Sequence, residues 1–514
     1  MRILHCRQTS RKVVGSGGPL TIASYRRHFV RKGFFFKTAA LVLFYSAAML
    51  VMDVDVVCAQ SQMRGLGIVA KLGASRDSDD RQLARIQELG ADTVVFTPGE
   101  WAANEHGKGQ FSFNPETRYL LARIAAAHMR PVVLLFRKNP AYANPLDQDA
   151  FARYCSWVAA TLNGSVAAYQ IWNEPSNFDV REQYGGAWNG RDNAPWVSQF
   201  SHMMALAAKA IRQADPFATV IVSLEGPPLI YDLRDHHDDF ADISGVALHP
   251  YPGNHAAEQV PWGGPATALR DGVSVADNQG SLASTIEIQS RSDPIKYLGR
   301  PLEAWITEYG FPTCDVSSSS QQYQCIAPEV QAAYHVRGLI VGLASGVKLW
   351  TPYELADEGE NPKDVQQNFG LVRAESTGFA PKPAFFALRR VATILGKRWK
   401  YLSAAPARTT ISESGSKVIE PNSSVEGPQV VWFRTDRGFW AFMWEAGVYD
   451  VQTRATAKVE LPYSAELAGK VTVTDLVSGK SVPSVVSRNE RDGKLIASLN
   501  VSSRPVVLQL PAHQ

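Results

Sequence analysis

Short apolar runs alternate with helix-forming segments between residues 65 and 395, and this alternation limits the fold more than any other feature of the chain. Each run is four to six residues long, which is the length of a buried strand. The predicted strands are 65–70, 93–96, 131–136, 167–172, 219–223, 243–248, 302–307 and 347–350. The predicted helices are 79–90, 115–128, 149–162, 194–215, 281–297, 328–345 and 383–395. Eight strands alternating with helices favour an α/β fold, a closed (β/α)8 TIM barrel, over an open sheet.

The pattern changes after residue 396. Apolar runs at 430–433, 439–443, 471–474 and 506–510 are separated by Gly, Asn and Ser turns, and no long helix lies between them. Such a pattern is typical of an all-β domain of the sandwich type. We therefore expect a catalytic barrel over residues 60–396 and a C-terminal β-sandwich domain over residues 397–514.

The first 59 residues have the composition of an export signal. Residues 1–37 contain nine Lys/Arg and no Asp/Glu, and an apolar run follows at 38–52. Val57 and Ala59 then provide small residues at a cleavage site, although an uncleaved membrane anchor is the alternative. Without residues 1–59, 43 Lys/Arg face 47 Asp/Glu, a balance that argues against a nucleic-acid partner. We expect an exported protein, periplasmic or extracellular, with membrane contact only if this segment is retained.

Three cysteines remain outside that segment. Cys314 and Cys325 flank a polar, Ser-rich loop, and in an oxidising compartment they would close it as a disulfide. Cys155 lies on the apolar face of a predicted helix and is expected to be inert.

Two predicted strands end in a glutamate. The run 167–172 stops at Asn173, Glu174 and Pro175, and proline cannot continue a central strand. The run 302–307 ends at Glu308. In a barrel of this kind the carboxyl ends of the strands meet at one face, where active sites lie. A pair of carboxyl groups at such a face is what glycoside hydrolysis requires.

Other polar and aromatic residues follow the strand ends. They are Trp101, Glu105, Arg137, Lys138, His249, Tyr251, Tyr309, Trp350, Tyr353 and Glu354. This set contains no phosphate-binding loop, and no Cys/His spacing in the chain resembles a zinc site. We expect neither a cofactor nor a metal.

Several motifs carry a resemblance to a known clan. Trp172-Asn-Glu-Pro175 with Ile306-Thr-Glu-Tyr-Gly310 resembles the acid/base and nucleophile pair of the clan A glycoside hydrolases. Further stretches around residues 101–111, 249–252, 350–371 and 381–383 are similar to glycoside hydrolase family 39 and its bacterial exopolysaccharide-hydrolase relatives.

The resemblance implies a role for each main residue. Glu174 would be the general acid/base, with a raised pKa in one half of the cycle, and Glu308 the nucleophile. Asn173 would bind the sugar 2-hydroxyl, and Tyr251 or His249 would orient Glu308 and keep it ionised. A separation of about 5 Å between the two carboxyl groups is expected for such a pair.

The remaining predicted substrate-binding residues are Trp350, as an apolar floor for a pyranose ring, together with Trp101, Arg137 and Tyr309. Trp101 could equally pack against the barrel, and His249 could be a core histidine. Trp188, Trp196 and Trp262 lie in polar loops, where they could be sugar platforms or plugs that stabilise the loops.

These features predict a retaining glycoside hydrolase that cleaves O-glycosidic bonds in a polysaccharide. The resemblance implies that this polysaccharide is a bacterial exopolysaccharide. Two alternatives remain open. One is an exo-acting β-glycosidase of the xylosidase or glucosidase type on oligosaccharides. The other is a carbohydrate-binding envelope protein without activity, against which the intact pair of glutamates speaks.

Overall fold

The computed structural model describes residues 65–191, 194–261, 273–320, 322–413, 418–419, 422, 425–451, 455–461, 471–489 and 492–511. The residues from Ser61 onward group into one compact unit. The predicted export segment, residues 1–59, and Trp262 lie outside the described residues. No described helix has both the length and the apolar character needed to cross a membrane.

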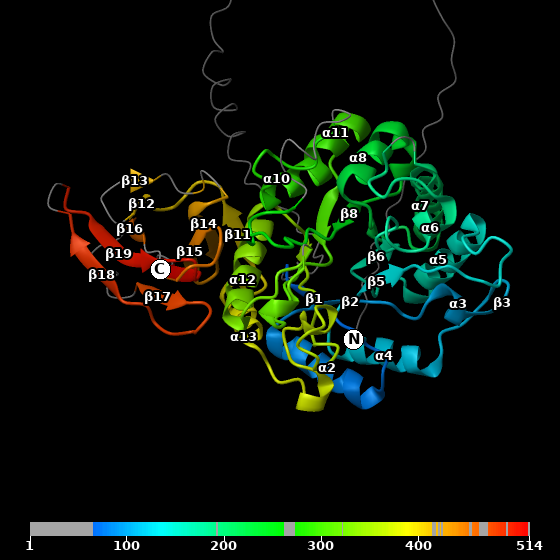
Figure 1. Ribbon diagram of the computed structural model, residues 1–514, viewed down its shortest axis with the longest axis horizontal. Coiled ribbons are helices and arrows are strands. Elements are labelled where there is room, and N and C mark those ends of the chain that lie inside the picture. The colour runs from blue at the N-terminus through cyan, green and yellow to red at the C-terminus, as the bar shows by residue number, and fades with distance from the viewer. Residues whose placement is uncertain are drawn as a thin grey trace, which may run out of the picture. The chain divides into compact units, whose positions relative to one another are not determined.

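All eight predicted barrel strands are present, and every pair of neighbours is parallel (Figure 1). In sheet order they are β1 (Gly67–Val69), β2 (Thr93–Phe96), β5 (Val132–Leu135), β6 (Ala168–Ile171), β7 (Val220–Val222), β8 (Gly245–Leu248), β9 (Glu303–Ile306) and β10 (Leu349–Trp350). A parallel bridge between Leu66 and Trp350 joins the last strand to the first. The Trp350 N–H donates to the Gly65 carbonyl at 2.8 Å, which closes the barrel.

Side chains inside and outside the barrel belong to separate cores. Ile221, Ala247, Trp305 and Leu349 pack in a small cluster with other strand residues, and this cluster fills the barrel interior. Neighbouring strand residues, such as Ile306, point the other way and join the large core formed with the helices. This alternation follows from the two-residue period of a strand.

The helices cover the outside of the barrel (Figure 1). They are α2 (Arg76–Leu89), α3 (Trp101–Asn104), α4 (Pro115–Ala126), α5 (Gln148–Leu162), α6 (Val180–Tyr184), α7 (Pro195–Ala214), α8 (Gly226–Asp235), α10 (Leu282–Glu287), α11 (Asp293–Leu298), α12 (Pro328–Ala344) and α13 (Pro383–Leu395). Short helical turns lie at His237–Phe240, Ile288–Ser292, Val316–Ser318, Gln366–Asn368 and Glu375–Thr377, and the hairpin β3 (Glu105–Gly107) and β4 (Gln110–Phe111) follows α3.

The sequence prediction missed helix α8. Its first residues, Gly226-Pro-Pro228, suggest a turn, but proline fits the first turn of a helix, where its missing N–H has no intrahelical partner to lose.

The C-terminal region is all β, as predicted. One antiparallel sheet consists of β11 (Trp399–Leu402), β14 (Gly427–Thr435), β15 (Gly438–Ala446), β20 (Val506–Pro511) and β17 (Thr472–Asp475). The other consists of β13 (Val418–Ile419), β12 (Thr409–Glu413), β16 (Ala455–Leu461), β19 (Leu495–Val501) and β18 (Ser484–Arg488). One buried cluster contains side chains of both sheets, including Met443 and Val459, as in a sandwich.

A buried arginine connects helix α12 to the first of these sheets. The Arg337 guanidinium donates to both carboxylate oxygens of Glu258, at 2.7 and 2.5 Å, and to the Gly447 carbonyl at 2.7 Å. The indole N–H of Trp444 in β15 donates to the same carboxylate at 2.7 Å. Glu258 lies in the loop after β8, so this network holds a loop that begins at the active face of the barrel.

The predicted disulfide between Cys314 and Cys325 is confirmed. It closes the loop after β9. Cys155 is a free, buried thiol whose pKa is raised well above its usual value by burial, in agreement with the predicted inert role.

Removal of the buried arginine tests the network around Glu258. We expect Arg337→Ala to lower the free energy of unfolding by about 3–5 kcal/mol, because it leaves a buried carboxylate without its cation. The matched control is Arg398→Ala, which breaks an exposed ion pair with Asp436 and should change stability little. Chemical denaturation of both variants gives the comparison, and an equal effect of the two substitutions would contradict this account.

Candidate active site

Glu174 is placed by a tight turn after β6. Trp172 and Glu174 have positive φ angles of 64° and 43°, which side-chain-bearing residues rarely adopt. Trp172 is fully buried, and its indole N–H donates to the Phe178 carbonyl at 3.2 Å. The Glu174 N–H donates to the Ser223 hydroxyl at 3.0 Å. The turn is therefore held from both sides, and it directs the carboxyl group of Glu174 towards the strand ends.

His249 brings the two predicted catalytic glutamates together. Its Nδ1 atom lies 2.9 Å from Oε1 of Glu174 and 3.7 Å from Oε2 of Glu308. Its Nε2 atom lies 3.0 Å from the Thr307 hydroxyl. The distance between Oε1 of Glu174 and Oε2 of Glu308 therefore cannot exceed the sum of their two distances from Nδ1.

Tyr251 contacts the second glutamate. Its hydroxyl donates to Oε2 of Glu308 at 2.8 Å. The ring of Tyr251 lies 6.1 Å from those of Tyr323 and Tyr353, centroid to centroid, so Tyr251 packs against two further tyrosines.

The pKa values of the two glutamates shift in opposite directions. Burial raises the pKa of Glu174, but the hydrogen bond and positive charge of His249 outweigh it, and the net pKa is lowered. Burial and the negative charge of Glu174 raise the pKa of Glu308. Burial lowers the pKa of His249, but the two carboxylates raise it to about 9. With His249 protonated, Glu174 is thus not the residue with the raised pKa that the sequence analysis expected.

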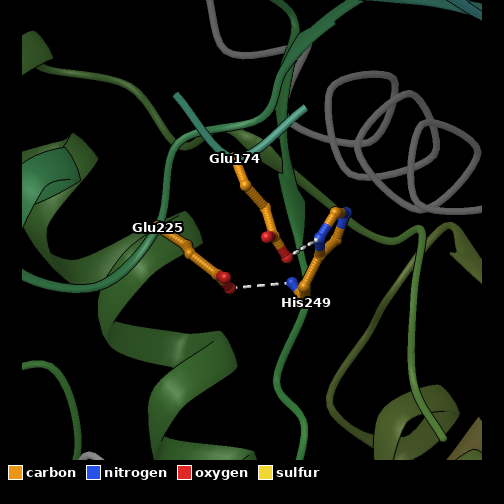
Figure 2. Close-up of side chains that lie close together, drawn as sticks. All are labelled: Glu174, Glu225 and His249. Carbon is orange, nitrogen blue, oxygen red and sulfur yellow. Dashed lines mark hydrogen bonds and ion pairs between the residues drawn. The ribbon is translucent and has the colours of Figure 1, made fainter. Parts of the chain in front are cut away.

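A further carboxyl group, that of Glu225, was missed by the sequence analysis and lies beside Glu174 and His249 (Figure 2). Glu225 follows β7 and accepts the backbone N–H of His249 at 2.7 Å. Burial raises its pKa to about 7. A similar signal was present in the sequence, since the mostly apolar run 219–224 is followed by a glutamate like the other two strands, but Gly226 and not proline comes next, and no paired motif marks the position.

Glu174, Glu225 and His249 also form the one group of possible metal ligands found within the described residues. Ligand atoms of Glu174, Glu225 and His249 all lie within 4.8 Å of one another. Hydrogen bonds between the members of the cluster already account for its close packing.

A cavity of about 340 Å³ opens beside Glu174. Its wall includes Glu225, His249, Trp188 and Tyr323, whereas Glu308 does not line it. Trp188 is 51% exposed. Trp196 is fully buried, and its indole N–H donates to the Ala187 carbonyl at 2.8 Å. Of its two predicted roles, it therefore has that of a plug that stabilises the loop.

Asn173 precedes Glu174 and has a buried polar atom available. Its side-chain oxygen has no hydrogen-bond partner among the described residues. A buried carbonyl oxygen is costly to leave unpaired, so this atom is suited to accept a hydrogen bond from a ligand.

The structure places Trp350 and Tyr309 away from the site, in contrast to the prediction. Both are fully buried, and their rings contact one another with centroids 4.5 Å apart. They pack against α12, where a Cβ atom at Gly342 would lie 2.3 Å from the Trp350 ring and one at Gly338 would lie 2.6 Å from the Tyr309 hydroxyl. Trp350 faces the helices because Leu349, one residue earlier, faces the barrel interior.

Trp101 and Arg137 do not line the cavity either. Trp101 is fully buried, and its indole N–H donates to Glu105 at 2.7 Å, which agrees with its predicted alternative of barrel packing. Glu105 also accepts hydrogen bonds from Asn139 and Tyr142. The Arg137 guanidinium lies 3.8 Å from Asp179, in the loop after β6.

Comparison with known proteins identifies the fold. No protein-family model and no curated protein matches the chain. A family 39 glycoside hydrolase from the gut symbiont Bacteroides cellulosilyticus WH2 superposes with a TM-score of 0.62 at 18% identity, over 88% of this chain and 81% of the other. The family 30 subfamily 8 xylanase Xyn30A from Clostridium acetobutylicum gives 0.52 at 13% identity, over 88% and 96%. A family 30 endoxylanase from Clostridium papyrosolvens C71 gives 0.51 at 12% identity, over 88% and 97%.

The chain has the fold of clan A glycoside hydrolases. The predicted resemblance is thus confirmed for the barrel and for the all-β region that follows it.

A buried carboxyl group near this site makes stability depend on pH. Burial raises the pKa of Glu354, in the loop after β10, from 4.5 to about 8. The folded protein therefore keeps a proton that the unfolded chain releases above about pH 4.5, so Glu354 makes stability fall as the pH rises from about 4.5 to about 8.

We expect Glu354→Gln to remove this contribution. Between pH 5 and pH 9 the unfolding free energy of the unmodified protein should fall by about 2–4 kcal/mol more than that of the variant. Denaturant unfolding at several pH values measures the difference. Glu329→Gln, an exposed change on α12, is the control and should follow the unmodified protein. Parallel pH curves for Glu354→Gln and the unmodified protein would contradict the assignment.

Proposed function

We propose that this protein is a retaining glycoside hydrolase, with Glu174 as general acid/base and Glu308 as nucleophile. The observation that carries the proposal is the approach of both carboxyl groups, from the ends of β6 and β9, to one ring nitrogen of His249. Retaining enzymes place their carboxyl groups about 5–5.5 Å apart, and inverting enzymes about 6.5–9.5 Å. The short distances to His249 favour the first arrangement.

The proton between Glu174 and His249 reconciles the pKa directions with these roles. When it lies on Glu174, His249 is neutral, and its Nε2–H can donate to the Thr307 hydroxyl. The positive charge that lowers the pKa of Glu174 is then gone. Protonation of Glu174 removes a negative charge that raises the pKa of Glu308, while the neutral His249 no longer supplies the positive charge that lowers it. The hydrogen bond from Tyr251 then remains to stabilise the ionised form of the nucleophile.

In the first step Glu308 would attack the anomeric carbon while Glu174 gives its proton to the departing oxygen. The Tyr251 hydroxyl stabilises the ionised form of Glu308 before the attack. The side-chain oxygen of Asn173 is available for the sugar 2-hydroxyl, a contact that strengthens in the transition state. Glu174 would then take a proton from water, which attacks the glycosyl-enzyme and restores the starting configuration.

The proposed substrate is a polysaccharide. The resemblance to family 39 and its bacterial relatives favours a bacterial exopolysaccharide. The similar structures include two xylanases from family 30, so xylans belong in the same substrate screen. Release of reducing ends from a panel of exopolysaccharides, xylans and glucans identifies the substrate, and a panel without any product would contradict the proposed activity.

Export is part of the proposal. The basic and apolar character of residues 1–59 supports it, and a disulfide in the loop after β9 suits an oxidising compartment. Mass spectrometry of the secreted protein should find an amino terminus near Gln60. Secreted protein that retains residues 26–52 would contradict cleavage.

Azide rescue separates the roles of the two glutamates. We expect Glu174→Ala to lower turnover by about 10²–10⁴, with a smaller loss on aryl glycosides whose leaving group needs no proton. Azide should restore its turnover and give a glycosyl azide of the same anomeric configuration as the substrate. Glu308→Gly should be nearly inactive, and azide should give the opposite configuration, because it then attacks in place of the nucleophile.

Proton NMR of the two azide products measures this difference. Glu354→Gln serves as the control, since it removes another buried carboxyl group, which forms no hydrogen bond with Glu174 or Glu308, and azide should not accelerate it. The same configuration from both glutamate variants would mean that the roles are assigned wrongly.

A further inference from the structure

The cavity lies on the acid/base side of the site. Glu174 belongs to its wall, and Glu308 does not. In the proposed reaction the nucleophile attacks the anomeric carbon, and the acid protonates the oxygen of the departing group. The departing sugar must therefore lie on the side of Glu174, which is where the cavity is. Its volume of about 340 Å³ is at the lower end of the range for small-molecule pockets.

The wall of the cavity offers one surface for a sugar ring. Trp188 is the large aromatic side chain of this wall that is exposed, at 51%. Apolar faces of pyranose rings pack on such indole rings. Tyr323 lies in the same wall, on the loop that the Cys314–Cys325 disulfide closes.

The ionisable groups of the cavity favour a positive ligand. Glu174, Glu225 and His249 line it, and no lysine or arginine is found among its described lining residues. The ring of His249 offsets the charge of Glu174, with which it is hydrogen-bonded, whereas Glu225 is hydrogen-bonded, within the described residues, only to the His249 backbone N–H. An anionic sugar would therefore meet the carboxyl group of Glu225, and like charges at short range repel.

Glu225 has room for a further partner. It accepts one hydrogen bond, from the His249 backbone N–H, and it forms no ion pair with lysine or arginine in the described part of the chain. Burial raises its pKa to about 7, although the positive charge of His249 lowers it. A ligand ammonium would supply both the charge and the hydrogen bond.

We propose that this cavity is the leaving-group subsite and that it takes a sugar with a free amino group, which pairs with Glu225 while its ring packs on Trp188. The proposal rests on the proposed function for the orientation of the substrate. It implies a polysaccharide that contains hexosamine units without N-acetyl groups.

Binding of single sugars to the whole protein tests the subsite without any turnover. Isothermal titration at pH 6.5 compares D-glucosamine with D-glucose, N-acetyl-D-glucosamine and D-glucuronate. We expect the Kd of glucosamine to be at least fivefold below that of glucose, and glucuronate to bind most weakly. Equal Kd values for glucosamine and glucose, or no glucosamine binding at 50 mM, would overturn the proposal.

Three variants locate the binding. Glu225→Gln should reduce the preference for glucosamine to twofold or less and leave the Kd of glucose within twofold. Trp188→Ala should weaken both sugars about equally. Glu182→Gln removes the same charge from helix α6, outside the cavity wall, and should leave the preference unchanged. A preference that survives Glu225→Gln would overturn the assignment.

Glu225→Asp keeps the charge, and it should retain part of the preference if Glu225→Gln fails to fold. These readouts are separate from catalysis. If the unmodified protein shows no amine preference but hydrolyses a neutral glycan, the subsite proposal fails and the proposed function stands. A clear amine preference in a protein whose Glu174 and Glu308 variants keep full activity would remove the proposed function and leave the amine-binding cavity.

Discussion

The contact of His249 with two carboxyl groups is the interaction on which the site depends. Two buried carboxylates this close would repel one another strongly in a medium of low dielectric constant. The imidazole reduces that repulsion, because Nδ1 lies 2.9 Å from Glu174 and 3.7 Å from Glu308. The same contact lets one proton lie on either His249 or Glu174. It thus provides both the stability of the cluster and the acid that the proposed reaction needs.

The rest of the fold holds this contact in place. Closure of the barrel brings the ends of β6, β8 and β9 to one face. The buried Trp172 and the Ser223 hydroxyl hold the turn that carries Glu174. The Tyr309 hydroxyl donates to the Ala257 carbonyl at 2.9 Å, next to the buried Glu258 that Arg337 and Trp444 contact. Tyr309 therefore connects the chain beside Glu308 to the loop after β8, and the first β-sheet supports that loop.

Much of this arrangement could be predicted from the sequence, for identifiable reasons. Apolar runs separated by turn residues predict the eight strands, and an apolar run that ends in a glutamate predicts Glu174 and Glu308. The same signal exists at Glu225, but nothing beside it marks its role. Trp350 shows a different limit, because a shift of one residue along a strand reverses the face of a side chain. The sequence does not show that Leu349 takes the inward place, or that Gly338 and Gly342 leave room for Tyr309 and Trp350.

The stereochemistry of hydrolysis distinguishes Glu308 as a nucleophile from Glu308 as a base. Proton NMR during the first minutes of reaction, before the released sugar mutarotates, shows the configuration of the first product at the anomeric carbon. We expect this configuration to be the same as in the substrate, because Glu308 and water displace in succession. A first product of the opposite configuration would contradict it, since a water molecule would then attack directly and Glu308 would act as a base.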